Sequence, residues 1–163
     1  MRKSLGLDGA NFLRQMIRET LPIYEKRAQA VRDREFRLHF QPQLSLSTGT
    51  LVGFEALIRW QHPQRGLVNP ADFLPVAEAR RLILPIGDWV LDEALRCTAR
   101  WREMGLLHVP VAVNLSGAQL RAAGFIDGIE QALSRHPGAL LELEFTERML
   151  MDDTRVVQGL LAR

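Results

Sequence analysis

The chain is poor in several kinds of residue and segment, and each shortage excludes a class of protein. Cys97 is the only cysteine among 163 residues, so no internal disulfide is possible, which fits a reducing cytoplasm. Aromatic residues make up 7% of the chain and do not interleave with basic residues, so we predict no surface for a nucleic acid polymer. No apolar run approaches the roughly 20 residues that a membrane helix needs, so we predict no membrane span.

The composition that remains is that of an ordinary globular protein. Hydrophobic residues make up 47% of the chain and charged residues 25%, and the net charge is +2. Residues 1–34 are rich in arginine and lysine and contain an apolar stripe, so we expect an N-terminal helical leader. It could be a connector helix, a dimer contact or a lid, but a helix packed on the domain is preferred. Residues 35–163 are expected to form the main domain.

From Phe36 onward, the pattern of apolar residues changes to a period of two, which is typical of strands. Helical stretches then alternate with further strands. The predicted strands lie near 36–41, 51–60, 109–115 and 140–146, and the predicted helices near 71–80, 83–104 and 125–136, with the first two helices broken near Pro85. The turn at Ser47-Thr48-Gly49 predicts an antiparallel pair for the first two strands. The later alternation predicts an α/β fold with a parallel sheet, and this length accommodates only part of a (β/α) barrel, which needs about 250 residues.

One side of each predicted strand is polar. The polar positions, which alternate with apolar ones, are His39, Gln41, Glu55, Arg59, Asn114, Ser116, Glu142 and Glu144. Glu55, Asn114 and Glu144 offer hard oxygen ligands that suit Mg²⁺, Mn²⁺ or Ca²⁺ rather than zinc. Arg59 offers a fork of donors for a phosphate, so the set points to phosphoryl chemistry. Plain ion pairs, Glu55–Arg59 and Glu144–Arg148, explain the same spacing equally well.

Five motifs, taken in order, resemble the EAL family of cyclic di-GMP phosphodiesterases. They are Phe40-Gln41-Pro42; Glu55-Ala56-Leu57-Ile58-Arg59-Trp60 with His62-Pro63; the run from Pro70 to Glu78; Asn114-Leu115-Ser116; and Glu144-Phe145-Thr146-Glu147. The resemblance covers most of the chain and about the first half of the family domain.

The resemblance implies a TIM-like (β/α) barrel whose first strand is antiparallel, and metal-dependent hydrolysis of cyclic di-GMP to the linear dinucleotide. It implies Mg²⁺ or Mn²⁺ as the cofactor. By position it assigns Glu55, Asn114 and Glu144 as metal ligands. It assigns Gln41, Leu57 and Arg59 as substrate contacts, and Glu147 as a residue that steadies a neighbouring catalytic loop.

The chain also departs from the family pattern. The family's paired aspartates, catalytic lysine and later glutamate would all lie beyond Arg163, and no lysine follows Lys26. Asp152-Asp153 is interpreted as the start of a helix rather than as the aspartate pair. We therefore expect a domain truncated after about half of the barrel.

Three functions follow from this expectation. The chain is a phosphodiesterase domain, or a non-catalytic module that binds cyclic di-GMP or a protein, or a piece of a longer protein without a function of its own. The strand at 140–146 is expected to be an open sheet edge, which favours a homo-oligomer or a partner that covers it.

Overall fold

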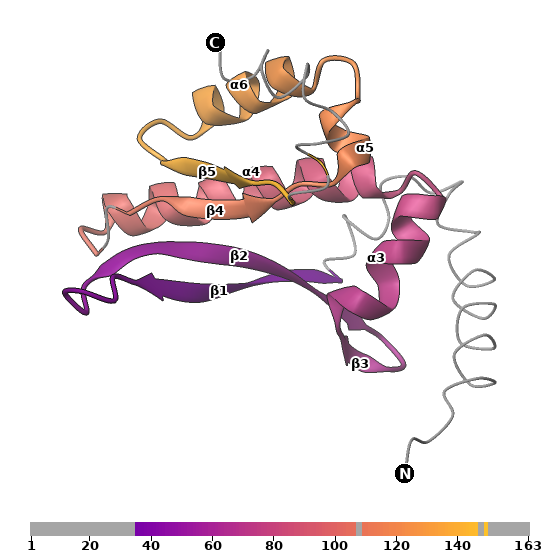
Figure 1. The fold of residues 1–163 in the computed structure, drawn as a ribbon, viewed down its shortest axis with the longest axis horizontal. Helices are drawn as coiled ribbons and strands as arrows, with labels where there is room; N and C mark the ends of the chain where they lie inside the picture. The colour runs from indigo at the N-terminus through magenta and orange to yellow at the C-terminus, as the bar shows by residue number, and fades with distance from the viewer. Residues whose placement is uncertain (1–34, 107–108, 147–148, 150–163) are drawn as a thin grey trace.

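The computed structural model describes residues 35–106, 109–146 and 149, in which one mixed sheet is packed against helices (Figure 1). The elements in chain order are β1 (Phe36–Leu44), β2 (Leu51–His62), β3 (Gly66–Val68), α3 (Pro70–Ala79), α4 (Ile83–Glu103), β4 (Val111–Asn114), α5 (Gly117–Leu120), α6 (Phe125–Arg135) and β5 (Leu141–Glu144). The expected leader at 1–34 lies outside the described residues. None of the helices in the described part combines the length and apolarity that crossing a bilayer requires.

The sheet begins with the antiparallel hairpin that the sequence predicts. β1 pairs with β2 along its whole length, from Phe36 opposite Trp60 to Leu44 opposite Leu51. The turn is closed by a hydrogen bond from Ser45 N to Thr50 O of 2.9 Å, and Gly49 takes the left-handed conformation that the turn needs, with φ of 68°.

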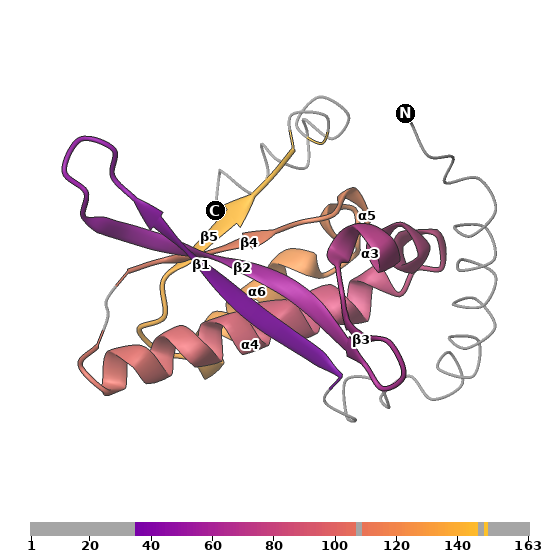
Figure 2. The same cartoon turned by 90° about the horizontal axis from the view of Figure 1, so that it is seen from below.

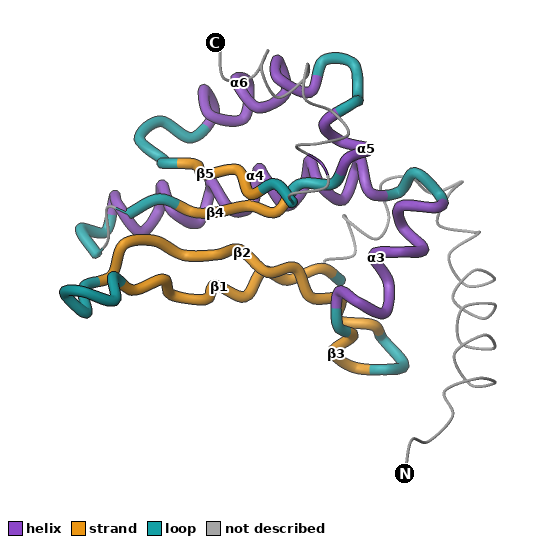
Figure 3. The backbone as a smooth tube through the Cα atoms, viewed as in Figure 1, coloured by secondary structure: helices purple, strands orange, loops and turns teal. Residues whose placement is uncertain are grey.

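β4 and β5 run parallel to β2, whereas the short β3 runs antiparallel to it. The strand order is β1-β2-β4-β5, with the short β3 paired to β2, and the β2–β4 and β4–β5 pairs are both parallel (Figures 1 and 3). An antiparallel first strand followed by parallel strands with helices between them confirms the predicted partial barrel.

The apolar side of the sheet packs on α3 and α4, as the alternation predicts. Ala56, Ile58 and Val113 are at most 8% exposed and belong to one core cluster with Val90 and Ala94 of α4. In the same cluster, the Trp60 ring lies 5.7 Å from the Phe73 ring, and its indole Nε1 donates to Glu35 Oε2 at 2.9 Å. The buried indole donor is therefore satisfied, as a stable core requires.

A second cluster fixes α6 on the long helix α4. Leu91 and Leu95 of α4 pack with Ile129 and Ala132 of α6, and Leu95 is fully buried. Figure 2 shows β1 and β2 crossing in front of α4, and α6 lies beside α4. The two helices therefore support the sheet from one side and leave its polar side to the site.

Three sequence predictions are corrected. The first two helices separate at Arg80–Leu82, where Arg81 has φ of 57°, and not at Pro85. Pro85 lies in the first turn of α4, where a missing N–H costs no helical hydrogen bond. The sequence also did not predict β3, or α5, which begins with a capping box between Ser116 and Gln119.

Burial in this second cluster gives the first prediction. Leu95→Ala should lower the free energy of unfolding by about 2–5 kcal/mol, because a fully buried leucine loses its contacts and leaves a cavity. Leu46→Ala is the matched control, since Leu46 is fully exposed in the hairpin turn and should change stability by less than about 0.5 kcal/mol. Equal losses for the two variants in urea unfolding would contradict the described core.

Candidate active site

The polar side of the sheet, which we call the polar face, gathers predicted site residues from four strands. The register of β1 and β2 sets Gln41 opposite Glu55, and the parallel register of β4 and β5 sets Asn114 beside Glu144. Residues paired across neighbouring strands project to the same side of a sheet. Residues separated by as many as 103 positions in the chain therefore share one surface.

A direct contact joins two of the predicted metal ligands. Asn114 Nδ2 donates to Glu55 Oε1 at 2.6 Å. The contact is diagonal, because Glu55 pairs in register with Ala112, two residues before Asn114. A short hydrogen bond to a carboxylate is strong and fixes the orientation of both side chains.

Arg59 does not form the ion pair with Glu55 that was the competing interpretation. Its Nη1 atom donates instead to the backbone carbonyl of Ile58 at 2.8 Å. Glu144 also has a different neighbour on the polar face, because its Oε1 atom accepts a hydrogen bond from Gln43 Nε2 at 3.4 Å. Arg148, the other half of the second competing pair, lies outside the described residues.

The other predicted site residues differ in their surroundings. Gln41 is exposed and Leu57 is half-buried, and both lie on the polar face near Glu55. Glu147 lies outside the described residues, so its expected role in steadying a loop stays a prediction. His62 of the second motif is buried, and its Nδ1 atom accepts from Gln64 N at 3.1 Å, which suits a structural role.

Sequence reasoning missed two residues of the polar face, Arg37 and Gln43. Arg37 lies opposite Arg59, and Gln43 lies opposite Gly53. Both alternate with apolar residues in β1 in the same way as Gln41. This alternation in the sequence was enough to place them on the polar face. Each of the two opposed arginines donates to the carbonyl of the residue before it, Arg37 to Phe36 and Arg59 to Ile58.

The oxygen ligands on the polar face fit one side of a site for a hard divalent cation. Glu55 and Glu144 supply carboxylate oxygens, and Asn114 uses its amide nitrogen toward Glu55, which leaves its carbonyl oxygen as an acceptor. Mg²⁺ and Mn²⁺ prefer such oxygen ligands. Within the described part of the chain, no group of three His, Cys, Asp or Glu side chains gathers to hold a metal, so the amide is needed to complete this set.

Comparison with known proteins identifies the family of the chain. The sequence profile of the EAL domain family matches residues 25–163. The chain belongs to the EAL domain family.

Two curated relatives of this EAL domain come from Pseudomonas aeruginosa. The bifunctional diguanylate cyclase/cyclic di-GMP phosphodiesterase MucR is 44% identical over 138 residues, which are 83% of this chain and 20% of MucR. The cyclic di-GMP phosphodiesterase NbdA is 37% identical over 155 residues, which are 91% of this chain and 20% of NbdA. The chain thus spans about a fifth of the length of these relatives.

Solved EAL structures share the fold. The P. aeruginosa MucR phosphodiesterase in complex with c-di-GMP has a TM-score of 0.77 and 39% identity, and the match covers 92% of this chain and 59% of that one. The FimX EAL domain from P. aeruginosa bound to c-di-GMP has a TM-score of 0.70 and 26% identity, with 94% and 56% covered.

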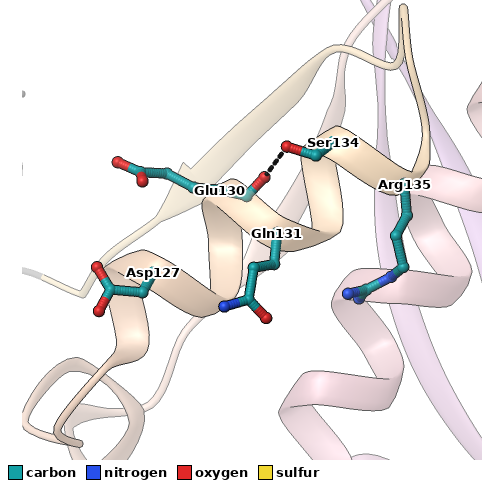
Figure 4. Close-up of a pocket in the computed structure, with 5 residues that line it drawn as sticks. All are labelled: Asp127, Glu130, Gln131, Ser134 and Arg135. Atoms are coloured by element: carbon teal, nitrogen blue, oxygen red, sulfur yellow. Dashed lines mark hydrogen bonds between the residues drawn. The ribbon is translucent and has the colours of Figure 1, made fainter.

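Two hollows lie away from the polar face. One lies between α4, α5 and α6 and is lined mainly by apolar residues, with Asp88 contributing a carboxyl group whose pKa is raised by burial. The other is lined by five residues that all come from α6, where Ser134 Oγ donates to the Glu130 carbonyl at 2.8 Å (Figure 4). Neither hollow contains a residue of the EAL motifs at Glu55 or Glu144.

Asp92 of α4 binds the C-terminal end of α6 beside these hollows. Its Oδ1 atom accepts from Arg135 Nη2 at 2.8 Å and from His136 Nε2 at 3.1 Å. Burial alone would raise the pKa of Asp92, but the hydrogen bonds from Arg135 and His136 outweigh it and hold the pKa below the ordinary value. Folding therefore favours the charged form of this carboxyl group.

The lowered pKa predicts the pH dependence of stability. The contribution of Asp92 should be fully present above its ordinary pKa of 3.8 and should disappear as the pH falls through the lower folded value. Asp92→Asn should therefore cost about 0.5–1 kcal/mol at pH 7, the range of an exposed ion pair, and less than that at about pH 3, below the ordinary pKa. Urea unfolding at both pH values measures this, with Glu103→Gln at the end of α4 as the control. A cost that is independent of pH would contradict the role of the charge.

Proposed function

We propose that this EAL domain serves metal-dependent hydrolysis of cyclic di-GMP to the linear dinucleotide. The observation that carries the proposal is the joining of Glu55 and Asn114 by a hydrogen bond, with Glu144 in register beside Asn114. The similarity to MucR and NbdA, which are named as cyclic di-GMP phosphodiesterases, supports the substrate.

Arg59 is proposed to bind a phosphate of the substrate, with Gln41 and Leu57 contacting the rest of the dinucleotide. Arg59 and Arg37 lie directly opposite one another on neighbouring strands. The planar guanidinium group of Arg59 matches the geometry of a phosphate and can donate two parallel hydrogen bonds to it.

Glu55, Asn114 and Glu144 are proposed to hold Mg²⁺ or Mn²⁺. A bound divalent cation would supply charge that neutralises the phosphoryl group and would activate a water molecule. The Asn114 amide holds one oxygen of Glu55 in place, so that this carboxylate is oriented before any ligand arrives. Glu147 keeps its proposed role of steadying a neighbouring loop, which rests on the sequence motif.

The second candidate function is binding of cyclic di-GMP, or of a protein partner, without hydrolysis. The small number of metal ligands favours this function, since the described polar face offers two carboxylates and one amide. Under both proposals the chain works in the cytoplasm, which suits its single cysteine.

The direct test is to incubate the chain with cyclic di-GMP and Mg²⁺ or Mn²⁺ and to separate the products by chromatography. We expect the linear dinucleotide to form, and we expect Glu55→Ala to lower the rate at least 100-fold because it removes a metal ligand and the partner of Asn114. Glu130→Gln on the outer side of α6 is the control and should keep the wild-type rate.

Calorimetric titration with cyclic di-GMP separates the two candidate functions. Binding without product, with affinity lost in Arg59→Ala, would favour the binding module over the enzyme. Neither binding nor product from a folded chain would contradict both the hydrolysis and the binding of cyclic di-GMP.

A partner at the open edges of the sheet is a further part of the proposal. In the described part of the chain, β1 and β5 each pair with a single strand, so each leaves a row of backbone groups without a sheet partner. We expect the purified chain to self-associate, with a mass above 18.5 kDa in light scattering coupled to size-exclusion chromatography. A monomer that melts cooperatively at high concentration would contradict this expectation.

A further inference from the structure

The side chain of Gln43 links two strands of the polar face that lie far apart in the sequence. Its side chain starts from β1 and donates to Glu144 on β5, which is 101 residues away in the sequence. Two strands, β2 and β4, lie between β1 and β5 in the sheet. The contact therefore spans the polar face from one edge strand to the other, and it ends on a residue of the proposed metal site.

Small residues on the intervening strands make room for this connection. Gly53 pairs with Gln43 in the β1–β2 register, and a Cβ atom at Gly53 would lie 3.0 Å from Gln43 Oε1. That separation is tighter than most Cβ contacts, so the Gln43 amide would have to shift by a few tenths of an ångström. On β4, Ala112 has the parity of Asn114 and is only 1% exposed, so neighbouring side chains cover it. A larger residue at Gly53 would push the Gln43 side chain from its place.

We propose that Gln43 is a positioning residue for Glu144, and that Gly53 keeps the space in which Gln43 lies. A glutamate on a short strand has several rotamers, and ordering it costs free energy when a ligand binds. A donor that holds Oε1 reduces this cost and leaves the second carboxylate oxygen for a cation. The inference rests on the proposed function, because it assigns Gln43 a role toward the same metal site.

The test measures Mn²⁺ affinity by calorimetry, independently of any hydrolysis. Gln43→Leu keeps a similar volume but removes the donor, and we expect it to weaken Mn²⁺ binding about tenfold, as the loss of a hydrogen bond behind a metal ligand typically does. Gly53→Ala should weaken binding in the same direction because it displaces Gln43. Gln61→Leu, at an exposed position of β2, is the matched control and should bind like the wild type.

A double-mutant cycle distinguishes positioning from a general structural effect. In a Glu144→Gln background, Gln43→Leu should cause no further loss of Mn²⁺ affinity, because the carboxylate that Gln43 positions is already gone. An equal loss in both backgrounds, or wild-type affinity for Gln43→Leu, would overturn the inference while leaving the proposed function intact. If the folded wild-type chain binds no Mn²⁺, the proposed metal site fails, and the role of Gln43 fails with it.

Discussion

The parallel pairing of β2 with β4 is the constraint on which the site depends. It aligns Glu55 with Ala112 and so brings Asn114 within 2.6 Å of the Glu55 carboxylate. A slip of one residue would turn every side chain of the strand to the opposite face. It would move Glu55 into the apolar core on α4 and expose Ala56 and Ile58, so the hydrophobic core and the candidate site fix the same register.

The shared dependence of the core and the site on one register explains why charged side chains can lie together on the polar face. The core clusters on α3, α4 and α6 hold the sheet from the other side, and polar contacts are free to orient side chains for a ligand. Two such contacts, Asn114 to Glu55 and Gln43 to Glu144, run between strands. Both leave oxygen atoms that are available to a cation, and Arg59 adds a guanidinium group to the same face of β2. The polar face thus has features that suit an anionic substrate and a divalent metal.

The sequence predicts much of this arrangement because strand alternation carries information on both faces at once. The period of two identifies the apolar face from Ala56 and Ile58, and the polar face from Glu55 and Asn114. Register is harder to predict, because it depends on contacts between strands, so the choice of Asn114 rather than Arg59 as the partner of Glu55 needed the structure. Short elements such as β3 and α5 were missed, because three or four residues are too few to show a period. The gap between the two helices was predicted at 81–82, but the assignment of the break to Pro85 was wrong, because proline is tolerated in the first turn of a helix.

The most direct test of this account follows the side-chain amide of Asn114 by nuclear magnetic resonance during a Mg²⁺ titration. If Glu55, Asn114 and Glu144 form one cation site, the Asn114 amide signals should shift saturably, and the shift should vanish in Glu55→Gln. A folded protein whose Asn114 signals stay unchanged, or whose shifts are confined to acidic residues of α6 such as Glu130, would contradict the assignment of the polar face as the metal site.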